Sequence, residues 1–212
     1  MKKILTLLVV ALSTAFAANA QIGIIGGFTS SNTSLSAKDL MTNAKNMSLY
    51  HVGVAYRLEL IDLLVIQPEI TYQTKGAKLT DAALKTVDFT SKSGYVEGAV
   101  GIQLGIDLLA FRPFLLAQPF VGYQVTGSEK FGSETIASLQ NAKNKLEYGI
   151  GLGGGIELLN HLQISVQWYT NLGKLYQNDK VDAVSIGTAI ASTAFKDVKN
   201  YQGVKITLGL FF

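Results

Sequence analysis

The residues that could carry acid–base or nucleophilic chemistry are few. The chain contains two histidines, His51 and His161, and no cysteine. His51 has Ser48 nearby, but a hydrolase or acyltransferase built on His51 would need an Asp or Ser brought in from another strand. His161 falls in a predicted turn away from His51, so the two imidazoles cannot share one site. We therefore predict no catalytic residues and a protein that is not an enzyme.

Metal and cofactor sites are equally poorly supported. The absence of cysteine excludes a thiolate metal site, a disulfide framework and a cysteine-linked lipid anchor. The glycine-rich run at 149–155 could be mistaken for a phosphate-binding loop, but no switch from strand to helix follows it and no Lys-Ser/Thr pair closes it. Space for long side chains inside a narrow barrel explains these glycines better. We predict no cofactor and no metal.

A set of charged residues recurs at alternate positions of otherwise apolar segments. These residues are predicted to face one common interior: Arg57, Glu59, Glu69, Lys75, Glu97, Glu147, Glu157 and Lys205. Because the set mixes both signs, it can form an internal salt-bridge network, the form in which buried charges are usually retained. The alternative that remains open is a narrow ion path.

The elements that must position these charges are eight segments with a period of two, which places successive side chains on opposite faces of a strand. We expect strands near 21–29, 48–60, 64–76, 94–106, 112–126, 145–158, 162–172 and 201–212. The segment at 112–126 is less regular. There we face five residues outward, because Gln118 and Gln124 then point inward: Leu115, Ala117, Val121, Tyr123 and Val125. The sequence predicts an all-β fold, an eight-stranded antiparallel up-and-down barrel.

The apolar faces of these segments contain no Asp, Glu, Lys or Arg. A charge at the middle of a lipid-facing barrel surface costs about 2–4 kcal/mol for Arg or Lys, so this absence favours lipid on the outside. Three connections are short and four are long, an asymmetry typical of outer-membrane barrels with short periplasmic turns and long extracellular loops. We expect short helices in the loops, at 36–45, 80–87, 133–145 and 181–195, with capping side chains at Thr80-Asp81 and Ser133-Glu134.

The amino terminus is typical of a secretory signal. Lys2 and Lys3 precede an apolar stretch, and Ala18-Asn19-Ala20 forms a small-residue cleavage site. We predict a signal peptide at 1–20 and a barrel domain at 21–212, exported to the outer membrane of a Gram-negative cell. Without the two signal lysines the chain has 16 basic and 15 acidic residues, so no nucleic-acid partner is implied.

Two further features suggest how the barrel sits in the membrane. If the first strand rises from the periplasm, five aromatic residues fall at the outer end of the lipid face: Tyr50, Tyr72, Tyr123, Tyr148 and Trp168. Amphipathic rings at one level predict an interfacial girdle, although tyrosine and tryptophan are also good strand residues. Phe212 ends the last strand, either as a signal read by the barrel assembly machinery or simply as an apolar terminus.

Several short patterns resemble the outer-membrane β-barrel domain of Bacteroidetes often labelled PorT-like and, more distantly, eight-stranded barrels of the OmpA/OmpX type. The likeness spans nearly all of the mature chain. The patterns are Gly23-Ile24-Ile25-Gly26-Gly27, Gln67-Pro68-Glu69, Arg112-Pro113-Phe114 and Leu208-Gly209-Leu210-Phe211-Phe212; Glu97-Gly98-Ala99 departs from the more usual Glu-Ile-Pro.

The sequence thus predicts a non-enzymatic outer-membrane barrel with a structural or surface-binding role through its extracellular loops. The alternative implied by the resemblance is an accessory role in secretion or transport. The expected partners are outer-membrane lipid, the barrel assembly machinery during biogenesis, and an extracellular or secretion-complex protein. Solvated loops without a partner remain an equal alternative to loops that bind.

Overall fold

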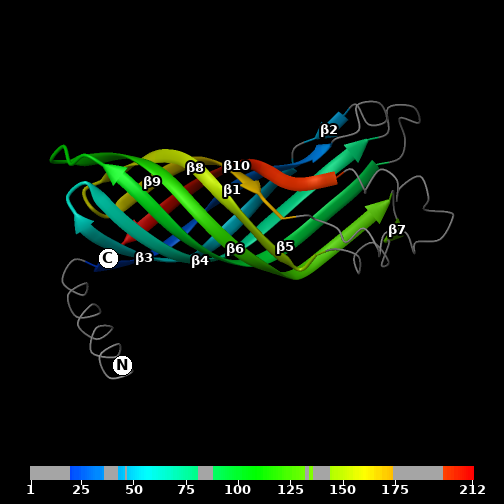
Figure 1. The fold of residues 1–212 in the computed structure, drawn as a ribbon, viewed down its shortest axis with the longest axis horizontal. Coiled ribbons are helices and arrows are strands. Elements are labelled where there is room, and N and C mark those ends of the chain that lie inside the picture. Colours follow the sequence, from blue (N-terminus) through cyan, green and yellow to red (C-terminus); the bar gives the residue numbers. More distant parts are fainter. Residues whose placement is uncertain are drawn as a thin grey trace, which may run out of the picture.

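The computed structural model describes residues 20–35, 43–45, 47–80, 88–131, 134–135, 144–173 and 198–212. Eight long strands wind around a common axis (Figure 1). They are β1 (Ala20–Leu35), β3 (Met47–Ile61), β4 (Leu64–Thr80), β5 (Asp88–Gly105), β6 (Phe111–Phe131), β8 (Leu146–Leu158), β9 (Leu162–Asn171) and β10 (Val198–Phe211). Two short strands, β2 (Asn43–Lys45) and β7 (Glu134–Thr135), lie on the edges of β4 and β6.

The sheet closes on itself, because β1 pairs with both β3 and β10 and β4 also pairs with β5, all antiparallel. The predicted eight-stranded antiparallel barrel is therefore confirmed. Paired residues can be followed once around the wall: Leu58, Ile66, Ile102, Ala117, Leu152, Trp168, Val204, Ser30 and Ser48. The path leaves β3 at Leu58 and returns to it at Ser48, an offset of ten residues. Such an offset in eight strands corresponds to a strand tilt of about 40°.

Alternation of side chains explains the two surfaces of this wall. On β10, Ile206, Leu208 and Leu210 are exposed on the outside, whereas Lys205 and Thr207 are buried inside. The same alternation runs along β9, whose burial changes at every residue from Gln163 to Tyr169. Backbone groups are satisfied between strands, so the outer surface needs no water to complete its hydrogen bonds.

In the irregular segment at 112–126, the side chains face the two sides of the wall as predicted from the inward placement of its glutamines. Leu115, Val121 and Tyr123 are exposed on the outside, and Gln118 and Gln124 are buried inside. Arg112 is buried on the same face, but the positions between it and Gln124 also include the apolar residues Phe114, Leu116 and Phe120, which fill part of the interior. This mixture of apolar and polar residues on the inner face is why the segment looked irregular.

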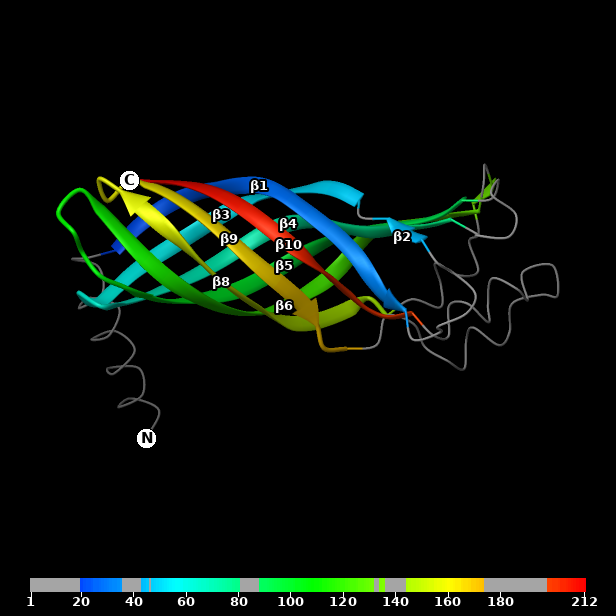
Figure 2. The same ribbon diagram turned by 90° about the horizontal axis from the view of Figure 1, so that it is seen from above.

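β1 continues to Leu35, beyond the predicted end at 29, and the three neighbouring strands β4, β5 and β6 are also longer than predicted. β4 and β5 stay paired to Thr80 and Asp88, and β5 and β6 stay paired to Phe89 and Phe131. They extend from the barrel wall at the end opposite the short turns (Figures 1 and 2).

The expectation of helices in the loops is wrong wherever the described residues test it. Asn43–Lys45 and Glu134–Thr135 are strands, not helical residues, and Thr80 ends β4 instead of capping a helix. The physical reason is that these residues find backbone partners on β4, β5 and β6, which satisfy their amide groups without a helix.

Some sequence predictions fall outside the described residues. These are the signal peptide apart from Ala20, the loop at 181–195 and the remaining parts of the other three loops. In the part of the chain that is described, no helix has the length and apolar character needed to span a membrane.

Candidate functional site

The interior of the barrel is the largest collection of charged and polar side chains in the described structure. Its most densely contacted group is Lys75 on β4, which is completely buried. The Lys75 Nζ lies 2.7 Å from Glu147 Oε1 and 2.9 Å from Glu97 Oε2. The second oxygen of Glu147 accepts a 2.6 Å hydrogen bond from Asn171 Nδ2. One ammonium is thus held between two carboxylates from β5 and β8.

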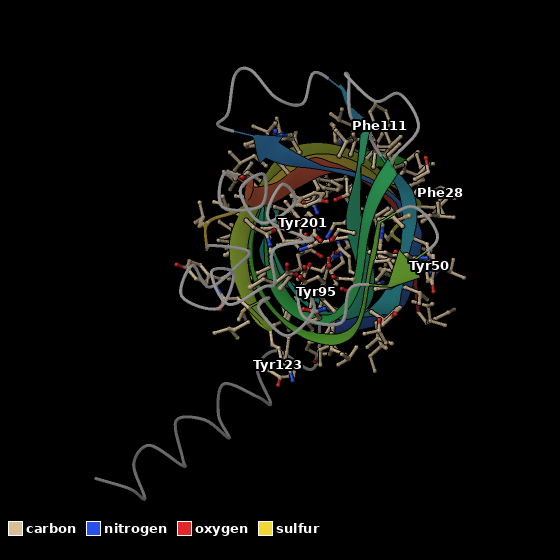
Figure 3. All side chains as sticks on the ribbon, turned by 90° about the vertical axis from the view of Figure 1, so that its right-hand side faces the viewer. Phe28, Tyr50, Tyr95, Phe111, Tyr123 and Tyr201 are labelled. Carbon is tan, nitrogen blue, oxygen red and sulfur yellow. The ribbon has the colours of Figure 1, made fainter. Side chains whose placement is uncertain are left out.

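Aromatic rings enclose the same ammonium. Lys75 Nζ is 4.3 Å from the ring centroid of Phe120, 5.1 Å from that of Tyr169 and 5.5 Å from that of Tyr95. A cation near several ring faces is stabilised by their quadrupoles, more strongly once it is removed from water. Figure 3, viewed along the barrel from its outer end, shows Tyr95 inside the wall.

A second ionic cluster lies near the short turns. Glu157 pairs with Arg57 Nη2 at 2.5 Å and lies 3.8 Å from Arg112 Nη1. Arg57 also donates to Gln21 Oε1 at 3.1 Å and to the Asn160 carbonyl at 3.3 Å. Each carboxylate and guanidinium here has partners on more than one strand, so the cluster ties β3, β6 and β8 together.

Glutamines and one more lysine fill the space between the clusters. Gln103 donates to Gln67 at 2.8 Å, and Gln67 donates to Glu69 at 2.9 Å. Lys205 donates to Gln118 at 2.9 Å and lies 4.0 Å from Glu97. Near the outer end, Tyr201 and Ser91 meet across the lumen with their oxygens 2.9 Å apart.

The predicted charge set differs from the buried one by two residues. Arg57, Glu69, Lys75, Glu97, Glu147, Glu157 and Lys205 are buried inside as expected. Glu59 is only partly buried and forms no ion pair with another described residue. Arg112, which the predicted set left out although it begins the expected strand at 112–126, is 1% exposed and inside. The buried set among the described residues is therefore four basic and four acidic residues, not an acidic excess.

His51 is buried among hydroxyls. Its Nδ1 lies 3.1 Å from Thr29 Oγ1, and its Nε2 lies 3.0 Å from Thr207 Oγ1. Ser48 is exposed on the outer surface, since residues three apart on a strand face opposite sides. The suggested His51–Ser48 proximity is therefore wrong. No group of three or more His, Asp or Glu side chains in the described ranges is placed to hold a metal ion.

Glycines of β8 make room for the interior side chains. A Cβ on Gly149 would meet the ring of Phe120, and a Cβ on Gly155 would lie 2.6 Å from Phe114 Cζ and collide with the Ile164 carbonyl. The space left by the missing side chains of Gly149 and Gly155 is therefore occupied by aromatic rings. The space beside Gly122 on β6 is occupied by a charged group, since a Cβ there would meet Glu147.

These contacts predict opposite outcomes for two Gly→Ala variants. Gly155→Ala should lower the free energy of unfolding by about 1–3 kcal/mol, because the interior would be overpacked. Gly98→Ala has nothing within 4 Å of its new Cβ and should be neutral or slightly stabilising. Urea unfolding in detergent micelles measures both; equal losses would contradict a tightly filled interior.

The five predicted girdle residues lie on the outside near one level. Four are 47–53% exposed, and Tyr72 is partly buried against Tyr50, with ring centroids 6.3 Å apart. Phe28, which lies in the predicted strand at 21–29 but was not included in the predicted girdle, pairs with Tyr50 and completes the set. When the six positions are followed from strand to strand, each is compared with the residue paired to the preceding one. Their displacements along the strands sum to ten residues in one circuit, which equals the offset of the barrel itself. They therefore form a closed ring, with Phe28, Tyr50 and Tyr123 visible outside the wall in Figure 3.

The carboxyl terminus lies at the end with the short turns (Figure 2). Phe211 is completely buried, and Phe212 is 66% exposed, with its amide donating to the Ile22 carbonyl at 2.9 Å. The last residue thus continues the outward row of β10 while remaining tied to β1.

Comparison with protein families matches residues 14–177 to the outer membrane protein beta-barrel domain. The chain belongs to this family. Membership places this outer membrane β-barrel protein in the outer membrane and agrees with the closed eight-stranded wall. No curated protein matches the chain.

Three solved structures are similar to this family member at low sequence identity. Neisserial surface protein A (NspA) is 11% identical over 92% of this chain and 99% of its own, with a TM-score of 0.47. Ail, the attachment invasion locus protein of Yersinia pestis, is 12% identical over 91% and 99%, with a TM-score of 0.45. OprG from Pseudomonas aeruginosa is 14% identical over 91% and 96%, with a TM-score of 0.38.

Proposed function

We propose that this protein is a non-enzymatic outer-membrane barrel that binds an extracellular partner through its outer end. In this proposal the chain is exported by its signal peptide, inserted by the barrel assembly machinery reading Phe212, and held at the outer interface by the aromatic ring. The observation that carries the proposal is the three-stranded sheet formed by β4, β5 and β6 beyond that ring.

The extent of this sheet follows from its pairing. From Tyr72 in the ring, β4 continues eight residues to Thr80, still paired with β5 up to Asp88. With a rise of about 3.3 Å per residue and a tilt near 40°, this segment reaches about 20 Å beyond the ring. A stable barrel does not need strands at that height, whereas a binding surface gains from a rigid support.

The interior supports a role at the outer end instead of one inside the barrel. Eight buried charges of balanced sign are paired or hydrogen-bonded, and an eight-stranded barrel is only wide enough for side chains to fill. His51 has a threonine hydroxyl at each ring nitrogen and is 2% exposed, so substrate cannot reach it in this conformation. An ion path and a His51-centred enzyme are both disfavoured.

An accessory role in secretion is the second candidate, and it rests on the PorT-like sequence patterns. Under that role the protein would contact a secretion complex, and those contacts would not require the projecting sheet.

Shortening the β4–β5 hairpin tests the proposal and separates the two candidates. Residues 77–80 pair in register with residues 88–91, and Gly76 pairs with Lys92. Replacing residues 77–91 with an Asn-Gly turn between Gly76 and Lys92 therefore preserves the register of the barrel below. Whole cells carrying either the full or the shortened protein are treated with a membrane-impermeant amine crosslinker, and the purified barrel is analysed for adducts. We expect adducts of the full protein that disappear in the shortened one.

Heat-dependent gel mobility provides the control that the shortened barrel still folds. Adducts with secretion components that persist in the shortened barrel would favour the accessory role. If the full protein gives no adduct, the surface-binding proposal is contradicted and the barrel acts as a membrane component alone.

A further inference from the structure

The periplasmic end of the barrel carries an unusual amount of exposed apolar surface at its turns. Leu109, at the tip of the β5–β6 turn, is fully exposed, and Leu159, at the tip of the β8–β9 turn, is 75% exposed. Ile106 and Leu108 beside them are 62% and 47% exposed. We call Ile106, Leu108, Leu109 and Leu159 the turn cluster.

The backbone holds the turn cluster in a defined position. Leu109 and Leu159 have φ angles of 63° and 51°, in the left-handed region that favours glycine or asparagine. The Leu108 amide donates to the Phe111 carbonyl at 3.0 Å, and the Leu159 amide donates to the Ala110 carbonyl at 3.0 Å. The two turns are therefore bridged, and leucines occupy tips where solvated turns usually carry glycine, asparagine or aspartate.

The turn cluster is continuous with the lipid-facing surface. On β6, the outward row from Tyr123 to Phe111 contains no charged residue, and the two ends are twelve residue steps apart along the strand. At about 3.3 Å per residue and a tilt near 40°, this row is roughly 25–30 Å tall, close to the ~25 Å apolar band of such barrels. Leu108 and Leu109 follow at the lower limit of that band, and the β5–β6 turn reaches furthest at this end (Figures 1 and 2).

The charges near the cluster indicate which lipid surface it fits. The three short turns, at 61–63, 106–111 and 159–161, contain Asp62 and Asp107 but no Lys or Arg. Apolar anchors with acidic neighbours are repelled by anionic headgroups, whereas anchors with basic neighbours are attracted to them.

We propose that the turn cluster is a lipid-binding anchor that inserts into the inner leaflet of the outer membrane, at zwitterionic phospholipid. The barrel is then fixed at both interfaces, by aromatic rings on the outer side and by aliphatic turn tips on the inner side. This inference is independent of any extracellular partner.

Tryptophan fluorescence tests the insertion directly. Trp168 is the single tryptophan, so a Trp168→Phe background allows one probe at a time. Leu109→Trp is refolded into phosphatidylcholine vesicles with bromine either near the headgroup end or deep in the acyl chains, with iodide on both sides. Val100→Trp, on the lipid face, is the buried reference, and Ser128→Trp, beyond the ring, is the water-exposed reference.

We expect Leu109→Trp to be quenched by shallow bromine at least half as strongly as Val100→Trp is by deep bromine. Its quenching by iodide should be at most one third of that seen for Ser128→Trp. If Leu109→Trp is quenched by iodide and by bromine to the same extent as Ser128→Trp, the proposed anchor is overturned. If the probe is open to iodide in vesicles but shielded in native outer membranes, a protein covers the cluster instead of lipid.

The lipid preference has its own test. Replacing half of the phosphatidylcholine by phosphatidylglycerol should reduce bromine quenching of Leu109→Trp at least twofold, and adding Asp107→Asn should restore most of it. Unchanged quenching in the anionic vesicles would overturn the zwitterionic preference.

Discussion

Replacing Lys75 by methionine should be the most damaging single change inside the barrel, with a loss of about 3–5 kcal/mol in the free energy of unfolding. Methionine keeps most of the side-chain volume but removes the ammonium that Glu97 and Glu147 share at 2.9 and 2.7 Å. Two carboxylates would then be buried without their cation, which costs more than losing the attraction itself. Urea titration of the refolded barrel, followed by Trp168 fluorescence, measures the loss.

Two further variants separate unpaired charge from general disruption. Lys92→Met removes an exposed lysine from the neighbouring strand β5 and should change stability by less than about 0.5 kcal/mol. Combining Lys75→Met with Glu97→Gln and Glu147→Gln should recover at least half of the loss, because no carboxylate is left without a partner. If the triple variant is no more stable than Lys75→Met alone, unpaired charge is not the cause.

An arginine on the middle of the outer face should produce the second large effect. Val100 on β5 is 41% exposed, lies four residues below the level of Val96 and pairs with Pro68. Val100→Arg should reduce the free energy of unfolding in phosphatidylcholine vesicles by about 2–4 kcal/mol, since the guanidinium would lie within the hydrocarbon.

Val125 provides the matched control. It is also a valine on the outer face, 51% exposed, but it lies two residues beyond Tyr123 on the outer side of the aromatic ring. Val125→Arg should cost at most about 1 kcal/mol, as expected near an interface. Equal effects at the two positions, measured by urea titration, would mean that the aromatic ring does not mark the membrane boundary.

The number of strands and their facing could be predicted from the sequence because a lipid-facing wall imposes a strict pattern. Each strand separates hydrocarbon from a narrow interior, so apolar and polar or small residues must alternate, and the alternation stops at turns. Even the irregular strand at 112–126 could be oriented, because Gln118 and Gln124 have no hydrogen-bonding partner in lipid. The family match and the closed wall agree with that prediction.

The ends of the strands could not be predicted in the same way. Beyond Gly76 on β4 and before Gly94 on β5 the alternation fades, because both faces of the projecting sheet lie outside the hydrocarbon. Pairing there continues through backbone hydrogen bonds from Ala77↔Ser91 to Thr80↔Asp88, and these bonds depend little on side-chain type. Residues 43–45 and 134–135 are also held by backbone hydrogen bonds to neighbouring strands, and their side chains give little sign of this pairing. Helices were therefore wrongly expected there.

The sequence by itself determined which strands cross the membrane and which charges face inward, because period and polarity are local properties. Only the tertiary structure decided how those charges pair. Arg112 shares the inner face of β6 with Gln118 and is the direct partner of Glu157 across the β6–β8 pairing, whereas Glu59 lies at the wall's lower edge beside an irregular pairing with β4. Lys75 meets Glu97, Glu147 and three rings from four other strands. These contacts depend on the ten-residue offset of the closed barrel, and that offset is set by the pairing of all eight strands and cannot be derived from any one segment.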